Sequence, residues 1–267
     1  GATFARFLYS APLVAALLWT YMSATAQALP QTTAAFWAFG AAGGLAQVLA
    51  TICVVLLFKA RNFAVGITFK KTETIQAVLV GLVVLGEGVS LWGFGAILLG
   101  VVGVLLLSVP PGQARFSLAD LGNRASRLGL GAGFLFAISS VCYRGASLEL
   151  AADDPLLRAG TTLAAVTAMQ MVGMALWLRW AEPGQMAAVW AARRVAVWVG
   201  LMSMAGSYCW FLAFTLQNAA YVKALGQVEL IFSALVTVLL FREPVLRREW
   251  LGIGVLSVSI VGLVLVI

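Results

Sequence analysis

The sequence has no histidine and few charged residues of any kind. Lys, Arg, Asp and Glu together make up 10% of its 267 residues, whereas soluble domains carry about 25%. Without histidine, general-base catalysis by imidazole and metal sites built on imidazole are excluded. Because 62% of the residues are hydrophobic, the composition indicates an all-α, polytopic membrane helix bundle.

Cysteine is also scarce, and its placement argues against disulfides. The three cysteines, Cys53, Cys142 and Cys209, fall within apolar runs at spacings that do not suit a metal site. We therefore expect small buried apolar residues at these positions. No group of residues suggests nucleophilic catalysis or metal-dependent hydrolysis, so we expect neither an enzyme nor a cofactor.

The net charge of +7 would favour a nucleic-acid partner in a soluble protein. In a membrane protein the placement of the charges matters more than their sum. We therefore expect no nucleic acid, and instead the lipid bilayer and a small-molecule solute as partners. The expected location is the inner cell membrane, with the chain as a monomer or a homodimer.

Nine apolar segments are long enough to cross a bilayer, which takes about 20 residues per helix. Short connections separate them and carry turn-forming residues, at Pro30, Pro110-Pro111-Gly112, Pro183-Gly184 and Pro244. Glycines within the segments do not follow strands, so they indicate close helix packing rather than phosphate-binding loops; they are Gly40, Gly43, Gly44, Gly129, Gly131, Gly133, Gly252 and Gly254. The predicted spans are 2–22, 34–58, 63–86, 90–109, 129–150, 155–178, 195–217, 219–241 and 250–267.

The chain contains an internal repeat. A shift of 156 residues aligns 44–87 with 200–243 without a gap, and twelve of the 44 positions are identical. Matches of Leu or Val carry little weight in so apolar a chain. The polar matches are harder to obtain by chance, and they are Asn62 with Asn218, Glu73 with Glu229, and Glu87 with Glu243.

The repeat predicts the organisation of the whole chain. The first repeat, 1–109, has four predicted spans, residues 110–128 form a cytoplasmic connection, and the second repeat, 129–267, has five spans. The simplest account is that one helix is missing from the N-terminal end of this sequence, and the alternative is a true nine-span protein. Repeats with an odd number of spans are inverted in the membrane, which places a solute site near the midplane at the repeat interface.

The basic residues of the connections predict the orientation. Eleven lie on one side of the membrane and none on the other. The charged residues of the connections on that other side are all acidic, and they are Glu87, Asp153 and Asp154. By the positive-inside rule the basic side is cytoplasmic. The eleven residues are Lys59, Arg61, Arg115, Arg124, Arg127, Arg179, Arg193, Arg194, Arg242, Arg247 and Arg248.

Three charges lie near the middle of the segment 63–87, at Lys70, Lys71 and Glu73. Each costs roughly 2.5–3.5 kcal/mol at the centre of a membrane helix. Lys70 and Glu73 are three residues apart and can neutralise each other on one helical face, but Lys71 is then left over. We favour the alternative that this face lines a polar cavity in which a solute binds.

The glutamates and the lysines of the candidate site differ under the repeat. Glu73 matches Glu229, whereas Lys71 matches Gln227 and Lys223 matches an apolar residue. We expect the glutamates to serve the scaffold or proton coupling, unless both only bind neighbouring helices. Glu229 is the better proton carrier, because it has no basic residue three or four positions away and we expect it to be desolvated, and Glu73 is the other candidate. The partner of Glu229 is open among Lys71, Arg6 and Arg144. The predicted substrate-binding residues are Lys70, Lys71, Glu73, Lys223, Gln227, Glu229, Arg6, Arg144 and Trp210.

The ends and starts of the matched segments resemble a known family. The residues are the glutamate-bearing helix, Gly86-Glu87, Arg242-Glu243-Pro244, Trp92-Gly93 and Trp250-Leu251-Gly252. They are similar to the drug/metabolite transporter superfamily, EamA type. The resemblance implies ten helices in two inverted five-helix repeats around a central cavity, and export of metabolites or drugs. It also implies a cytoplasmic C-terminus, whereas the charge count places the C-terminus outside.

The charges embedded in the spans favour an anionic solute. Six are basic and three are acidic, so a carboxylate or phosphate suits the site and a bulky cation does not. We therefore expect a secondary transporter that exports an amino acid, an organic acid or a similar carboxylate-bearing metabolite, with possible proton coupling. The alternative is a non-transporting membrane scaffold or lipid-handling protein of the same fold.

Overall fold

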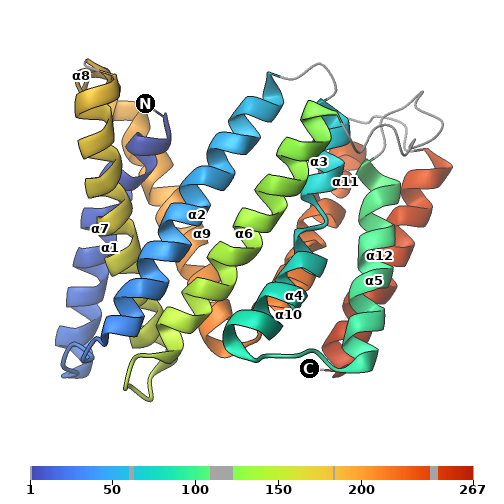
Figure 1. Cartoon of the computed structure of the whole chain (residues 1–267), viewed down its shortest axis with the longest axis horizontal. Coiled ribbons are helices and arrows are strands. Elements are labelled where there is room, and N and C mark those ends of the chain that lie inside the picture. Colours follow the sequence, from blue (N-terminus) through green and yellow to red (C-terminus); the bar gives the residue numbers. More distant parts are fainter. Residues whose placement is uncertain (1, 60–62, 109–122, 183, 241–245, 267) are drawn as a thin grey trace. The chain divides into compact units, whose positions relative to one another are not determined.

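The computed structural model describes residues 2–59, 63–108, 123–182, 184–240 and 246–266, and all regular secondary structure within these ranges is helical (Figure 1). The helices are α1 (Ala2–Thr25), α2 (Ala34–Phe58), α3 (Phe63–Lys70), α4 (Glu73–Leu85), α5 (Leu91–Ser108), α6 (Arg124–Leu148), α7 (Pro155–Ala181), α8 (Gln185–Ala191), α9 (Arg193–Leu216), α10 (Ala219–Gly226), α11 (Val228–Leu239) and α12 (Arg247–Val266). The expected all-α class is confirmed.

Eight segments of the described residues are long and apolar enough to cross a membrane. The chain is therefore a multi-pass membrane protein. The eight segments are Thr3–Thr25, Ala34–Phe58, Leu91–Ser108, Arg124–Leu148, Pro155–Ala181, Arg193–Leu216, Ala219–Val236 and Arg247–Val266. Inversion of the two sequence repeats stays a prediction.

The predicted span that has no counterpart among these eight segments, 63–86, is not one continuous helix. It is divided into α3 and α4, with Lys71 and Thr72 between them, and the predicted span 219–241 is likewise divided into α10 and α11 at Gln227 (Figure 1). The short helix α8 was not predicted. The expected turns at 110–112, Pro183 and Pro244, and most of the connection 110–128, lie outside the described residues, as do Asn62 and Glu243 of the repeat.

The helices form two compact units, and neither unit is one of the sequence repeats. The first unit contains Gly1–Val48 and Cys142–Gln217, and the second contains Leu49–Val141 and Asn218–Ile267. Each unit therefore combines a part of the first repeat with a part of the second.

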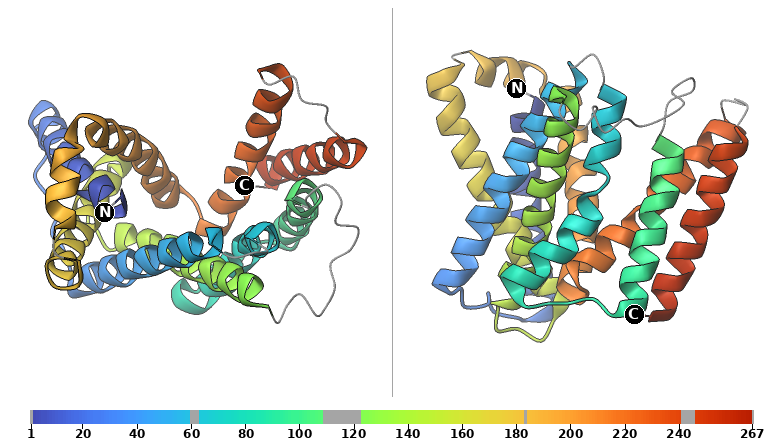
Figure 2. Two further views of the ribbon diagram at one scale, coloured as in Figure 1. Left: turned by 90° about the horizontal axis from the view of Figure 1, so that it is seen from above. Right: turned by 45° about the vertical axis from the view of Figure 1, so that its right-hand side comes forward.

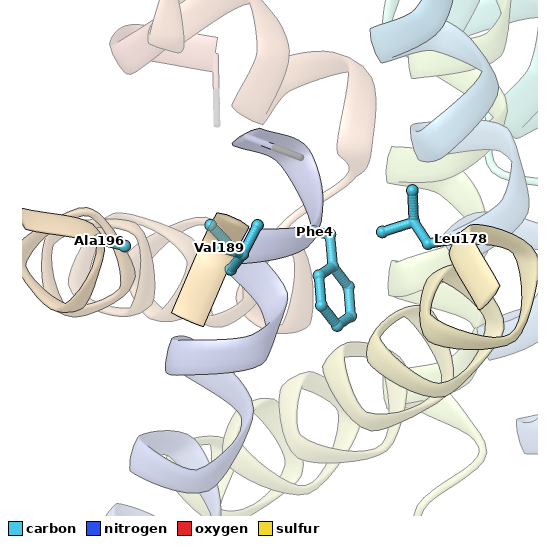
Figure 3. Packing of buried hydrophobic residues seen from close by; sticks show 5 residues of the cluster. Phe4, Leu178, Val189 and Ala196 are labelled. Carbon is cyan, nitrogen blue, oxygen red and sulfur yellow. The ribbon is translucent and has the colours of Figure 1, made fainter. Parts of the chain in front are cut away.

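One hydrophobic cluster of the first unit is built around the start of α1. Phe4 packs with Leu178 of α7, Val189 of α8 and Ala196 of α9, all nearly inaccessible (Figure 3). Between membrane helices such packing contributes through van der Waals contact rather than through removal of apolar surface from water. The contact fixes α1, which carries Arg6, against α7 and α9.

In the second unit α5 and α12 lie side by side, as both views of Figure 2 show. The contact depends on small residues: a Cβ atom on Gly103 would lie 2.8 Å from the backbone nitrogen of Leu256 and 3.0 Å from the carbonyl oxygen of Gly252. Ser259 adds a hydrogen bond to the carbonyl oxygen of Ala96, at 2.7 Å. Small residues and interhelical hydrogen bonds are the usual means by which membrane helices associate.

The predicted role of the glycines is confirmed at most of their positions. A Cβ atom would meet another helix within 3.4 Å or less at Gly40, Gly43, Gly44, Gly129, Gly133 and Gly252. The prediction is wrong for Gly131 and Gly254, which face open space. The three cysteines are free. The expectation that all are buried is confirmed for Cys142 alone, since Cys53 is half-buried and Cys209 is exposed.

Candidate functional site

The two helix breaks of the second unit fall at matching positions of the sequence repeat. The shift of 156 residues places Lys70, the last residue of α3, on Gly226, the last residue of α10. It also places Glu73 on Glu229, and each lies in the first turn of the helix after its break. The coincidence supports the duplication, because the repeat was recognised from residue identities and not from helix boundaries.

The charges at the breaks suit the ends of the half-helices. Lys70 and Lys223 lie in the last turns of α3 and α10, where the helix dipole favours cations. Glu73 and Glu229 lie in first turns, where it favours anions. Each such placement contributes about 0.3–1 kcal/mol. Part of the charge pattern therefore stabilises the breaks themselves.

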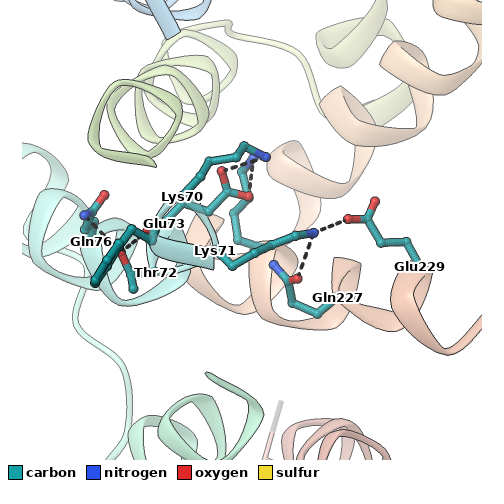
Figure 4. Close-up of polar contacts among 9 residues, drawn as sticks. Lys70, Lys71, Thr72, Glu73, Gln76, Gln227 and Glu229 are labelled. Carbon is teal, nitrogen blue, oxygen red and sulfur yellow. Dashed lines mark hydrogen bonds and ion pairs between the residues drawn. The ribbon is translucent and has the colours of Figure 1, made fainter. Parts of the chain in front are cut away.

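Two ion pairs connect the broken helices, and each broken helix contributes the lysine of one pair and the glutamate of the other (Figure 4). Lys71 extends from the α3–α4 break, and its Nζ lies 2.7 Å from Oε1 of Glu229 and 3.5 Å from Oε1 of Gln227. Lys223 of α10 lies 3.8 Å from Oε1 of Glu73. Each of the repeat-matched glutamates thus takes a lysine from the other broken helix. The partner of Glu229, left open by the sequence, is Lys71.

Glu73 is the enclosed carboxylate of the cluster. Its side chain is 8% exposed, and it is shared by Lys223 and by Lys70, whose Nζ lies 3.7 Å from Oε2. The side chain of Glu229 is 62% exposed. The expectation that Glu229 is the desolvated glutamate is therefore wrong, since burial belongs to its repeat partner. Lys71, expected to be left over, is 11% exposed and paired.

An aromatic ring and a close helix contact complete the surroundings of Glu73. The Phe136 ring of α6 lies below two ammonium groups, with Lys70 Nζ at 4.9 Å and Lys223 Nζ at 5.8 Å from its centroid. Gly133, one turn earlier, lets α6 approach the break: a Cβ atom there would lie 2.9 Å from the carbonyl oxygen of Lys70. Phe136 was not predicted from the sequence, because an aromatic residue in an apolar span carries no signal of its own.

Several oxygen atoms near the break have no hydrogen-bond partner. They are the buried Oγ1 of Thr74 and Oε1 of Gln76, together with Oε2 of Glu73, which has only the 3.7 Å ion pair with Lys70. The amide nitrogen of Gln76 is used, since it donates to Thr72 Oγ1 at 3.2 Å. Buried polar atoms are normally satisfied, so unsatisfied acceptors next to lysines indicate a place where a polar group can be received.

The remaining predicted site residues belong to the first unit and have partners there. Arg6 donates to Ser203 and Ser207 of α9. Arg144 donates from Nη1 to the carbonyl oxygen of Phe214 at 2.9 Å. Trp210 lies against the Phe214 ring, with centroids 5.6 Å apart. The two predicted glutamates and the four predicted residues around them, Lys70, Lys71, Lys223 and Gln227, come together in the second unit, whereas Arg6, Arg144 and Trp210 belong to the first unit.

The chain is similar in fold to a solved structure described as "Crystal structure of protein". The TM-score is 0.69, the match covers 99% of this chain and 89% of that chain, and the sequence identity is 16%. An identity this low supports the fold alone. No family model matches the sequence, and no curated protein matches it. An assignment of function therefore depends on the geometry of the charged cluster.

Proposed function

We propose that the chain is a secondary transporter of the EamA-type drug/metabolite class, which exports a small carboxylate-bearing metabolite across the inner cell membrane. The observation that carries the proposal is the charged cluster at two matching helix breaks. Discontinuous membrane helices are typical of transporter sites, because their free half-helix ends and charged residues face a solute. Ionisable residues within membrane spans are costly and are kept chiefly for function.

The composition of the cluster favours a solute with both an anionic and a hydrogen-donating group. Lys70, Lys71 and Lys223 exceed Glu73 and Glu229 by one positive charge. A carboxylate offers the compensating negative charge. The unsatisfied oxygens of Thr74 and Gln76 suit an amino or hydroxyl group. An amino acid or a hydroxy acid provides both groups on neighbouring carbon atoms.

The distances within the cluster suggest how a solute enters it. Glu73 has two lysines at 3.7 and 3.8 Å, both longer than a close ion pair. A solute carboxylate can therefore take over one lysine while Glu73 keeps the other. In contrast, the 2.7 Å pair of Lys71 with Glu229 is close and joins the two breaks. Glu229 is the exposed carboxylate of the cluster, and it stays the proton-coupling candidate.

The test is solute uptake or efflux in proteoliposomes, with amino acids and organic acids, with and without a pH gradient. Lys223→Met should reduce transport at least about tenfold, the effect of one lost charge-assisted contact. Lys59→Met is the matched control, because Lys59 lies at the end of α2 outside the cluster, and it should transport normally. Glu229→Gln should transport without a response to the pH gradient. Equal loss in both lysine variants would contradict a role for the cluster.

A scaffold or lipid-handling protein is the second candidate, favoured by the fit of the charges to the half-helix ends. In that case no solute of either class moves, and Lys223→Met changes thermal stability alone. The two candidates are therefore separated by the same set of proteoliposomes.

A further inference from the structure

Arg6 of the first unit carries its charge to the middle of a membrane helix. Its guanidinium donates from Nε to Ser203 Oγ at 2.5 Å and from Nη2 to Ser207 Oγ at 3.1 Å. The two serines lie near the centre of α9, which has 24 residues. Arg6 itself lies in the second turn of α1, but its side chain extends to the middle of α9, away from the helix ends where lipid headgroups would neutralise a snorkelling side chain.

The charge of Arg6 has no counter-charge in the part of the chain that the structure describes. No carboxylate of these residues pairs with it. The guanidinium contacts two neutral hydroxyls and lies over the Phe7 ring, with Cζ 5.6 Å from the ring centroid. Hydroxyls orient a guanidinium but cannot neutralise it. An unneutralised charge within a span indicates a functional site by default.

The group around Arg6 consists of hydrogen-bond donors. A guanidinium has five N–H groups, and the two serines take up two of them. Each serine oxygen accepts from Arg6, so its own O–H stays available to donate. None of the described residues accepts from Ser203 or Ser207. A planar fork of N–H groups beside two O–H groups, one helical turn apart, matches the two oxygens of a carboxylate.

We propose that Arg6, Ser203 and Ser207 form a binding site for the carboxylate of a small organic acid. The site uses none of the residues of the charged cluster in the second unit, so it goes beyond the proposed transport site. Phosphate of a lipid headgroup is the less suitable ligand, because headgroups lie at the ends of the helices and the serines lie at the middle of α9.

The test is a titration of the purified, detergent-solubilised chain with sodium acetate, against sodium chloride at equal ionic strength, followed by the thermal unfolding midpoint. The midpoint should rise saturably, because a ligand that binds only the folded chain stabilises it. Arg6→Gln should weaken this acetate response at least about tenfold, the effect of losing a bidentate charged contact. The double variant Ser203→Ala/Ser207→Ala should weaken it too, with Arg6 still present.

Two controls keep the outcome specific. Arg158→Gln alters another span arginine, whose Nε donates to the main-chain carbonyl of Ser147, and it should keep the full acetate response. Lys223→Met disables only the charged cluster of the second unit. Any acetate response that the Lys223→Met variant keeps therefore comes from another site, and Arg6→Gln should remove that part of the response. If Arg6→Gln and the double serine variant only lower the midpoint without acetate, at unchanged acetate affinity, Arg6 is a structural residue and the proposal is overturned.

Discussion

At the scale of the residue, pairing decides what a charge within a span can do. Lys71 and Glu229 were expected to be an unpaired lysine and a desolvated carboxylate, yet they form the closest ion pair of the cluster, at 2.7 Å. Glu73, on the other hand, is enclosed and held by two longer contacts. Removing one member of an enclosed pair costs more than removing both, because it leaves the other charge alone. Single substitutions in this cluster therefore report on the remaining partner as well.

Asp154, at the α6–α7 connection outside the spans, permits a pH test of one residue. The Tyr21 hydroxyl donates to its Oδ2 at 2.5 Å, with further bonds from the Leu156 N–H and from Gln27, and these hold the pKa of Asp154 below its ordinary value. A depressed folded-state pKa stabilises the fold above the unfolded pKa of about 3.9, and the stabilisation is lost as the pH falls through the folded pKa.

Tyr21→Phe should therefore lower the thermal unfolding midpoint at pH 7, and the deficit should shrink as the pH falls below about 4. Tyr9→Phe is the control: the Tyr9 hydroxyl donates to the carbonyl oxygen of Val189, which does not titrate, so its deficit should stay constant. If the loss of unfolding midpoint in Tyr21→Phe is also constant over the pH range, the hydrogen bond to Asp154 does not couple the stability of the fold to pH.

At the scale of the element, the sequence predicted the helices well and their breaks not at all. Long apolar runs define the spans, since each must bury its backbone polar groups in its own hydrogen bonds. The break between α3 and α4 contains neither Pro nor Gly, the usual signals. A signal was nevertheless present: lysine followed closely by glutamate at 70–73, matched by Lys223 and Glu229 around Gln227, is the charge order that two consecutive half-helices prefer.

The contact between α6 and α3 supplies a prediction for one element. A Cβ atom on Gly129 would lie 2.0 Å from the carbonyl oxygen of Gly66, a distance no side chain tolerates. Gly129→Ala should separate the helices and destabilise the chain by about 1–3 kcal/mol, the usual cost of overpacking. Gly131→Ala, two residues further on, faces open space and should be neutral or stabilise by up to about 1 kcal/mol through helix propensity.

Thermal unfolding in detergent measures both variants, and proteoliposome transport provides a second readout. Because Gly66 lies in the half-helix that ends at Lys70, Gly129→Ala should also impair transport, whereas Gly131→Ala should not. If the two alanine variants unfold at the same temperature, the close contact of α6 with α3 does not exist in the membrane.

At the scale of the whole molecule, composition and repeats predicted the class, the spans and most of the cluster. Charged residues in an apolar chain stand out because each is expensive there, which is why Lys70, Lys71, Glu73, Lys223 and Glu229 were found without a structure. The compact units were not predicted. They combine parts of both repeats, and which helices pack together depends on the fit of small and large side chains, for which an apolar sequence has no periodic signal.

The orientation of the chain in the membrane is predicted differently by two arguments. The charge count places the C-terminus outside, whereas the family resemblance implies a cytoplasmic C-terminus. α7 connects two exposed positions at opposite ends of one span, Ala151 before it and Ala187 in α8 after it. Ala187 lies between the arginines at 179 and 193–194, and Ala151 precedes Asp153 and Asp154. The positive-inside rule therefore places Ala187 in the cytoplasm and Ala151 outside.

In a variant without native cysteines, Ala187→Cys should resist a membrane-impermeant maleimide in intact cells and react after lysis, whereas Ala151→Cys should react in intact cells. The two positions control for each other, because any orientation that exposes one to the medium hides the other. Labelling of Ala187→Cys and protection of Ala151→Cys in intact cells would invert the assignment. The C-terminus would then be cytoplasmic, as the resemblance implies, and the eleven basic residues of the connections would need a reason other than insertion, such as attraction of anionic solutes to the outer face.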